Sequence, residues 1–215
     1  MFGNVGPVGA KNLSLNLEEL VQKYQVKIKG LIHVGAHYGQ EYEIYQKLGI
    51  ANLIFFEPLG QNFEILKTHV GEKAKLFQLA LGNENKKVKM YVESANNGMS
   101  SSILKPQKHL EQYPQIVFDQ EEIVEMVRLD DFLSEKENYN FLTIDVQGYE
   151  LEVLKGSRET LTNISGILTE VNRDELYSNC VRVEQLDDFL KNFDLTRVET
   201  NWEGGTWGDA FYLKK

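Results

Sequence analysis

Short apolar runs and amphipathic segments alternate along the first part of the chain. Residues 30–35, 51–58 and 74–82 are apolar runs of strand length, and residues 16–24, 40–49 and 61–71 have helical periodicity. Asn16 can cap the first helix because Glu19 stands three residues further on, and Gly49 and Gly71 end the other two. Strands separated by helices of this length predict right-handed crossovers and a mostly parallel sheet.

The middle of the chain interrupts this alternation. Residues 86–93 (KKVKMYVE) alternate between polar and apolar side chains and predict an edge strand. Residues 94–120 are polar and irregular and contain Pro106 and Pro114. A long irregular segment in a compact domain is usually a lid or a binding loop, so we expect residues 94–120 to contact the substrate.

The alternation returns in the second half of the chain. Residues 139–146 and 166–171 predict strands, and residues 148–156 and 183–193 predict helices. Residues 195–215 predict two strands joined through a Gly-Gly turn. We expect an α/β fold in which residues 13–215 form a single domain and residues 1–12 a flexible arm.

Composition narrows the class of protein. Of the 215 residues, 42% are hydrophobic and 26% are charged, as in ordinary globular domains. The net charge of −9 argues against a nucleic-acid partner, because binding along a phosphate backbone needs clustered Lys and Arg. The single cysteine, Cys180, allows no internal disulfide, and no apolar run reaches the length of a membrane span. The N-terminus has no signal-peptide pattern, so we expect a cytoplasmic protein without a membrane partner.

A glycine loop follows the first predicted strand, in the stretch IHVGAHYGQ. The nicotinamide-type pattern needs glycines at i, i+2 and i+5, but counted from Gly35 those later positions hold His37 and Gln40. Glycines at 35 and 39, with the small Ala36 between them, better suit the loop that passes beneath S-adenosylmethionine. Glu57, at the end of the second strand, can accept hydrogen bonds from both ribose hydroxyls. The alternative is a plain turn between strand and helix, with Glu57 solvated.

A second candidate acid is Asp145, in the stretch TIDVQGYELEVLKG. It follows a very apolar strand, at the edge where open parallel sheets bind ligands, and Gly148 allows close approach of a ligand. The alternative is that Asp145 only caps the helix that follows.

These stretches together resemble the FkbM family of S-adenosylmethionine-dependent methyltransferases, from residue 30 to the end of the chain. The family's first motif, D-V-G-A-N-x-G, corresponds to HVGAHYG, and its signature I-D-V-E-G-x-E corresponds to IDVQGYE, with VLKG following. The stretches FFEP, LALGN, TEVN and DAFYLKK also fit. The resemblance implies a Rossmann-like class I methyltransferase fold: a mostly parallel seven-stranded sheet with helices on both faces and an antiparallel C-terminal hairpin.

Three positions depart from the family pattern. His33 replaces the usual acid, His37 the usual Asn, and Gln147 the usual Glu. Both histidines can still hydrogen-bond the methionine end of the cofactor, although a protonated imidazole reverses the expected charge. Two histidines four apart also allow a zinc site, but no cysteine or third histidine stands nearby in the sequence, and we predict no metal.

The resemblance implies where the cofactor and the acceptor contact the chain. The residues expected at S-adenosylmethionine are His33, Gly35, Ala36, His37, Gly39, Glu57, Pro58, Ala80, Leu81, Ser101, Asp145 and Val146, with Ala80 and Leu81 beside the adenine. Family members methylate hydroxyls of sugars, glycans and polyketides. The residues expected at such an acceptor are Ser100, Ser102, Tyr113, Asn172, Trp202 and Trp207, although ordinary packing explains the tryptophans as well.

Methyl transfer to a hydroxyl needs a group that takes the proton. Asp145 is the first choice, because its strand end should face the methyl group, and His109, Glu170 and His37 are alternatives. Two other functions compete with O-methylation: a nucleotide-dependent oxidoreductase on a similar sheet, and a binding module without catalysis. The glycine spacing disfavours the oxidoreductase.

Overall fold

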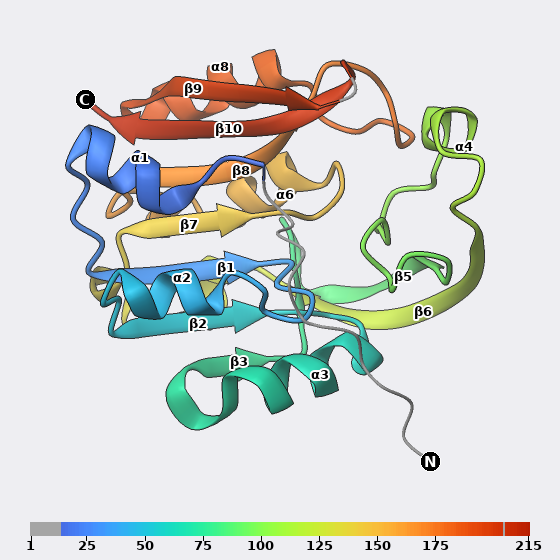
Figure 1. Cartoon of the computed structure of the whole chain (residues 1–215), viewed down its shortest axis with the longest axis horizontal. Helices are drawn as coiled ribbons and strands as arrows, with labels where there is room; N and C mark the ends of the chain where they lie inside the picture. The colour runs from blue at the N-terminus through green and yellow to red at the C-terminus, as the bar shows by residue number, and fades with distance from the viewer. Residues whose placement is uncertain (1–13, 204) are drawn as a thin grey trace.

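The main element of the fold is a seven-stranded sheet. In this computed structural model residues 14–203 and 205–215 are described, and the predicted arm, residues 1–12, lies outside them. The strands of the main sheet are β1 (Gly30–Val34), β2 (Asn52–Phe56), β3 (Lys75–Phe77), β7 (Phe141–Ile144), β8 (Gly166–Asn172), β9 (Leu195–Glu203) and β10 (Trp207–Lys214). They lie in the order β3-β2-β1-β7-β8-β10-β9, as Figure 1 shows. The pairs from β3 to β8 are parallel and β10 is antiparallel to both of its neighbours. The predicted mostly parallel sheet with an antiparallel C-terminal hairpin is confirmed.

The helices connect these strands. They are α1 (Leu17–Tyr24), α2 (Tyr42–Lys47), α3 (Gly60–Val70), α4 (Lys108–Gln112), α5 (Leu129–Phe132), α6 (Glu150–Lys155), α7 (Arg158–Leu161) and α8 (Val183–Leu190). The side chain of Asn16 accepts a hydrogen bond from the Glu18 N–H, so it caps α1 as predicted. Gly71 ends α3 with a φ of +64°. In the part of the chain that the structure describes, no helix has both the length and the apolar character needed to cross a membrane.

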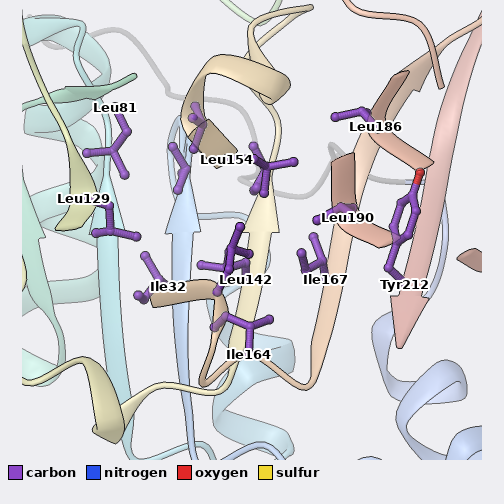
Figure 2. Packing of buried hydrophobic residues seen from close by; sticks show 14 of the residues in the cluster. Ile32, Leu81, Leu129, Leu142, Leu154, Ile164, Ile167, Leu186, Leu190 and Tyr212 are labelled. Atoms are coloured by element: carbon purple, nitrogen blue, oxygen red, sulfur yellow. The ribbon is translucent and has the colours of Figure 1, made fainter. Parts of the chain in front are cut away.

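Side chains of the parallel strands alternate between two hydrophobic layers, because successive residues of a strand point to opposite faces. Leu31 of β1 belongs to the layer that also holds Leu17 of α1 and Tyr45 of α2. Ile32 belongs to the opposite layer, in which Leu154 of α6 packs. Figure 2 shows this second layer, with α6 and α8 lying over β1, β7 and β8. Helices therefore cover both faces of the sheet, as expected.

A second, three-stranded sheet stands beside the carboxyl ends of the parallel strands (Figure 1). It contains β4 (Ala80–Leu81), β6 (Phe118–Val127) and β5 (Lys86–Glu93) in that order. The prediction of one strand over residues 74–82 is wrong, because the chain leaves the main sheet after Phe77 and joins the second sheet at Ala80. Residues 86–93 do form an edge strand, but of this second sheet.

The strand β6 was missed by the sequence pattern. Half of its side chains are exposed, and only Val124 and Met126 are buried. Its pairing with β5 sets opposite charges side by side, as in the Lys89–Glu121 ion pair at 2.9 Å. A strand held by such pairs lacks the apolar run on which a strand prediction depends.

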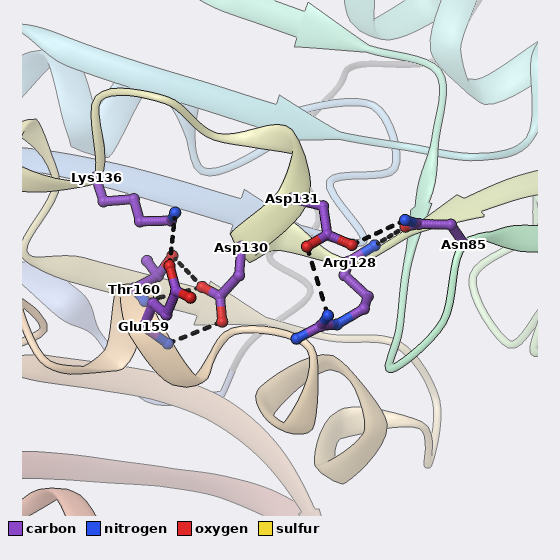
Figure 3. Close-up of polar contacts among 7 residues, drawn as sticks. All are labelled: Asn85, Arg128, Asp130, Asp131, Lys136, Glu159 and Thr160. Atoms are coloured by element: carbon purple, nitrogen blue, oxygen red, sulfur yellow. Dashed lines mark hydrogen bonds and ion pairs between the residues drawn. The ribbon is translucent and has the colours of Figure 1, made fainter.

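Polar contacts fix the segment that leads from the second sheet back to the main one (Figure 3). Buried Asp130 accepts hydrogen bonds from the backbone N–H groups of Glu159 and Thr160 at the start of α7, at 2.8 and 2.9 Å. Asn85 accepts a hydrogen bond from the Arg128 N–H at 2.7 Å. The bonds to Asp130 fix α5 against α7, and the bond to Asn85 ties the turn before β5 to the end of β6.

Candidate active site

Two cavities meet at the carboxyl ends of the parallel strands. The first, which we call the Glu57 cavity, is lined by the loop after β1, the end of β2, residues 79–81, residues 98–103 and the loop after β7. The second, which we call the Glu170 cavity, has a volume of about 420 Å³ and is lined by the ends of β8, β9 and β10 and by residues around α4. Met99, Asp145 and Gln147 line both cavities. The two cavities therefore share the carboxylate of Asp145.

Most of the residues expected at the cofactor line the Glu57 cavity. They are Gly35, His37, Glu57, Pro58, Ala80, Leu81, Ser101, Asp145 and Val146. His33, Ala36 and Gly39 are absent from this lining. The loops after three neighbouring strands thus supply the cavity wall, as the motif positions required.

The expectation that His33 contacts the cofactor needs correction. Its ring is 1% exposed, and it packs against Tyr45 and Phe55 on the α2 side of the sheet. Its Nδ1 lies 3.2 Å from the Tyr45 hydroxyl, which donates to the Thr143 hydroxyl. Burial lowers the pKa of His33 to about 3, so the ring is neutral at pH 7. His33 is a core residue, because a side chain on β1 next to the cavity-lining Val34 points to the opposite face.

Gly39 and Ala36 also pack rather than line the cavity. A Cβ on Gly39 would come within 2.7 Å of the Leu66 side chain of α3. Ala36 is fully buried in the same hydrophobic layer. The second glycine of the loop is therefore required for the approach of α3, whereas Gly35, with a φ of +78°, lies at the cavity.

Glu57 sits at the end of β2 with its carboxylate held by the backbone. Its Oε2 accepts the His37 N–H at 2.8 Å and its Oε1 accepts the Leu59 N–H at 2.9 Å. The Asn62 side chain also hydrogen-bonds this carboxylate, which retains acceptor capacity for a ligand hydroxyl. Burial raises the pKa of Glu57 to about 7, against the opposing effect of these hydrogen bonds.

This raised pKa predicts a pH dependence of stability. Between about pH 4.5 and 7 the unfolded chain loses the Glu57 proton while the folded chain keeps it, so stability falls as the pH rises. Replacing Glu57 by Gln should flatten this fall by about 1–3 kcal/mol in the free energy of unfolding. Urea unfolding at pH 5 and pH 7.5 without ligand measures the difference. Glu43→Gln, on the exposed side of α2, is the matched control, and an equal flattening in that variant would contradict the assignment.

His37 ties the glycine loop to the segment above it. Its Nε2 donates to the Asn97 carbonyl oxygen at 2.8 Å, and its Nδ1 accepts from the Gln40 amide at 2.8 Å. Burial lowers the pKa of His37, which keeps the ring neutral. Both ring nitrogens are hydrogen-bonded, and the bond from Nε2 fixes the glycine loop to Asn97. His37 therefore does not fit the role of a base. In residues 14–203 and 205–215, no group of three His, Cys, Asp or Glu side chains is placed to hold a metal ion.

Asp145 and Glu170 share one hydrogen-bond donor, the side-chain amide of Gln147. The Nε2 of Gln147 donates to Asp145 Oδ1 and to Glu170 Oε2, each at 2.7 Å. The two carboxylates fix which way the amide points, because only its nitrogen can donate to them. The Tyr177 hydroxyl lies 2.8 Å from the Ser100 carbonyl oxygen and 3.1 Å from Oε1 of Gln147, and its one proton can be donated to either oxygen. Burial raises the pKa of Asp145 and of Glu170 well above their usual range, and their mutual repulsion raises that of Glu170 further.

The alternative that Asp145 only caps α6 is not what the structure shows. The N–H groups of Val146 and Gly148 in this loop donate to Oε1 of Glu150, at 3.2 and 3.0 Å. The Asp145 carboxylate instead bonds the Gln147 side chain and lines both cavities. It is therefore available to a ligand.

His109 lines the Glu170 cavity together with the two carboxylates. It is 4% exposed, and its ring packs against Tyr113, Phe118 and Tyr177. Its Nδ1 is buried without a hydrogen-bond partner among the described residues. Burial lowers the pKa of His109, so the imidazole is neutral. It is a cavity residue and not an exposed loop residue.

The residues expected at the acceptor divide into two groups. Ser100, Tyr113 and Trp207 line the Glu170 cavity, and the Trp207 indole donates to the Tyr113 hydroxyl at 2.8 Å. Ser102, Asn172 and Trp202 are not among its lining residues. Ser102 is fully buried and donates to the Gln147 carbonyl, and the Trp202 ring is covered by the Arg173 guanidinium at 3.7 Å. The structure thus places these three side chains outside the lining of the Glu170 cavity.

Sequence reasoning missed several lining residues of the Glu57 cavity. Most are apolar, and they are Leu79, Met90, Met99, Ile103 and Tyr149, with Asn62 as a polar addition. Met90 lies in β5, which the sequence predicts as an edge strand without any role at the site. No local pattern distinguishes a methionine that lines a cavity from one that packs in a core. One sequence feature did point to the site. Gln147, which replaces the usual Glu in IDVQGYE, is the residue that bonds both Asp145 and Glu170.

Comparison with known proteins shows the family of the chain. The model of the FkbM methyltransferase domain matches residues 33–198. Over 154 residues the chain is 32% identical to the 2-O-methyltransferase NoeI of Sinorhizobium fredii (strain NBRC 101917 / NGR234). That alignment covers 67% of this chain and 63% of NoeI, so the chain matches less than two thirds of that relative.

Solved structures support the fold at low sequence identity. Sp1610 of Streptococcus pneumoniae, in complex with S-adenosyl-L-methionine, has a TM-score of 0.52 and 14% identity, covering 91% of this chain and 71% of that one. The magnesium protoporphyrin IX methyltransferase ChlM of Synechocystis PCC 6803, with the same cofactor bound, has a TM-score of 0.51 and 7% identity, with coverages of 92% and 76%. Both share the Rossmann-like fold. The chain belongs to the FkbM family of S-adenosylmethionine-dependent methyltransferases.

Proposed function

We propose that this chain transfers a methyl group from S-adenosylmethionine to a hydroxyl of a sugar, a glycan or a related small molecule. The observation that carries the proposal is the position of Asp145, which lines both the Glu57 cavity and the Glu170 cavity. A carboxylate shared by a cofactor cavity and a neighbouring cavity lies where a methyl group and its acceptor meet. The relative described as a 2-O-methyltransferase supports oxygen as the acceptor atom.

The residues of the Glu57 cavity fit the cofactor. Glu57 presents a fixed carboxylate of the kind that accepts hydrogen bonds from ribose hydroxyls. Leu79, Leu81 and Met90 form an apolar wall suited to an adenine ring. Gly35 leaves room in the loop, because a Cβ there would meet the Asp145 carbonyl oxygen at 1.8 Å.

The chemistry follows from the shared carboxylate. When bound, S-adenosylmethionine would supply a methyl group on a sulfonium centre: the acceptor oxygen would bond to the methyl carbon in line as the C–S bond breaks and S-adenosylhomocysteine leaves. In our proposal Asp145 accepts the hydroxyl proton while its Oδ1 stays bonded to Gln147. The raised pKa of Asp145 makes it a stronger base than an exposed aspartate. Glu170, on the same amide, holds or relays the proton, and the Trp207–Tyr113 pair offers an aromatic face to a sugar ring.

Cofactor binding is the first test. S-adenosylmethionine should bind and stabilise the folded chain, by about 4 kcal/mol at 1,000 times its Kd. NAD should not bind, because the loop lacks the glycine spacing of nicotinamide enzymes. Calorimetry measures the affinity of the chain for each ligand. Binding of NAD but not of S-adenosylmethionine would favour the oxidoreductase alternative.

Methyl transfer separates an enzyme from a binding module. We expect radioactive methyl from labelled S-adenosylmethionine to appear on hydroxyls of a carbohydrate panel, with S-adenosylhomocysteine as co-product. The position of the label, read by nuclear magnetic resonance, identifies the methylated hydroxyl. Tight cofactor binding with no transfer to any carbohydrate would favour the binding module.

A further inference from the structure

The Glu170 cavity carries an uneven charge. Three carboxylates line it, those of Asp145, Glu170 and Glu203, and none of its described lining residues is a lysine or an arginine. Glu170 is 5% exposed and comes from β8, whereas Glu203 is exposed at the end of β9. Acidic side chains therefore run from the floor of the cavity to its rim.

Basic residues next to the lining are engaged elsewhere. Lys108 precedes the lining residue His109, but its ammonium pairs with Asp174 at 2.7 Å. Arg173 lies at the end of β8, but its guanidinium stacks on the Trp202 ring at 3.7 Å. Neither of these side chains is among those that line the cavity.

The remaining polar groups of the cavity suit hydroxyl and amine donors. The buried Nδ1 of His109 has no hydrogen-bond partner among the described residues and belongs to a lining side chain. Glu170 bonds Gln147 through Oε2, and no hydrogen bond from a described residue reaches its Oε1. Groups of this kind accept hydrogen bonds from ligand hydroxyls or from an ammonium, and a carboxylate repels a phosphate.

We infer that the Glu170 cavity selects an uncharged or amine-bearing carbohydrate and rejects acceptors with a phosphate or carboxylate near the methylated hydroxyl. This inference rests on the proposed methyl transfer and narrows its substrate class. Sugar nucleotides, sugar phosphates and uronic acids bring a negative charge toward three carboxylates in a partly desolvated cavity, where like charges repel strongly. Neutral glycosides and amino sugars meet hydrogen-bond acceptors and the Trp207–Tyr113 face.

Matched glycosides test the inference with the full chain and labelled S-adenosylmethionine. For each of several hexoses, the probes are the neutral methyl glycoside, the 2-amino sugar, the uronic acid and the nucleoside-diphosphate sugar. Within one hexose, kcat/KM for the acidic and nucleotide forms should be about 10²-fold or more below that of the neutral or amino form. Equal or better methylation of an acidic form overturns the inference and leaves the methyltransferase proposal standing. Transfer to no form of any hexose, with cofactor binding intact, overturns the methyltransferase proposal itself.

A variant of the rim carboxylate adds a second readout. Glu203→Gln should reduce the discrimination between neutral and acidic forms about tenfold, since the exposed carboxylate at the rim is replaced by a neutral amide. Glu125→Gln removes one charge from the exposed face of β6 and should leave the ratio unchanged. The ratio is measured on the same hexose in both variants. An unchanged ratio in Glu203→Gln would overturn the charge argument.

Discussion

Replacing Asp145 by Asn is expected to lower kcat for methyl transfer by about 10² or more while S-adenosylmethionine still binds. The amide keeps the size of the carboxylate but cannot take a proton from the acceptor. The Asn Oδ1 can still accept from the Gln147 amide, so the variant can keep the bridge to Glu170 while it loses the charge and the basicity. Single-turnover rates at saturating cofactor measure the chemical step, and calorimetry measures the cofactor Kd separately.

The pH profile of this variant distinguishes a base from a merely structural residue. In the wild type, kcat should rise with pH as the coupled Asp145–Glu170 pair loses its proton, at a pH raised by burial. Asp145→Asn should remove that rising limb. Asp119→Asn, on the exposed part of β6, is the charge-matched control and should keep it. Near-normal turnover in Asp145→Asn, together with a large loss in Glu170→Gln, would transfer the role of base to Glu170.

The main sheet could be predicted because each of its strands carries a local signal. The run LIHV places Leu31 and Ile32 in opposite layers, and Gly49 and Gly71 mark the ends of helices. The second sheet could not be predicted in the same way. Its strand β6 exposes half of its side chains and pairs with β5 across a long intervening segment, and no local period reveals such a pairing.

The candidate site was predictable where it depends on strand ends. Gly35, Glu57 and Asp145 each follow a parallel strand, and such ends meet at one edge of a sheet. The errors concern which way a side chain points and what it touches. His33 belongs to the core because of its parity on β1, and Ser102 is fixed by a bond to the Gln147 carbonyl that comes from a segment far along the chain. The role of Gln147 itself depends on Glu170 and Tyr177, which only the folded chain brings together.

Gly35→Ala is the second change with a large expected effect. Gly35 has a φ of +78°, and a Cβ there would lie 1.8 Å from the carbonyl oxygen of Asp145, so the two cavity loops cannot both keep their positions. The loop after β1 is also held by the bonds from the Gly35 and Ala36 N–H groups to the Phe56 carbonyl, at 2.9 and 3.0 Å. A loss of about 3 kcal/mol or more in the free energy of unfolding is expected, since buried backbone cannot yield as a flexible side chain does. Binding of S-adenosylmethionine should be lost with it, because Gly35 and Asp145 both line the Glu57 cavity.

Gly49→Ala is the matched control, because it imposes the same backbone strain without a collision. Gly49 has a φ of +69°, and a Cβ there would meet nothing within 4 Å. Its cost should be about 1–2 kcal/mol, the cost of holding an alanine in the left-handed region, and cofactor binding should remain. Urea unfolding and calorimetry of the two variants separate the two effects: the difference in unfolding free energy is the cost of the collision at Asp145. The contrary result is that both variants lose the same unfolding free energy and Gly35→Ala still binds the cofactor. The loops after β1 and β7 would then not approach as closely as described, and the proposed position of Asp145 in the site would be wrong.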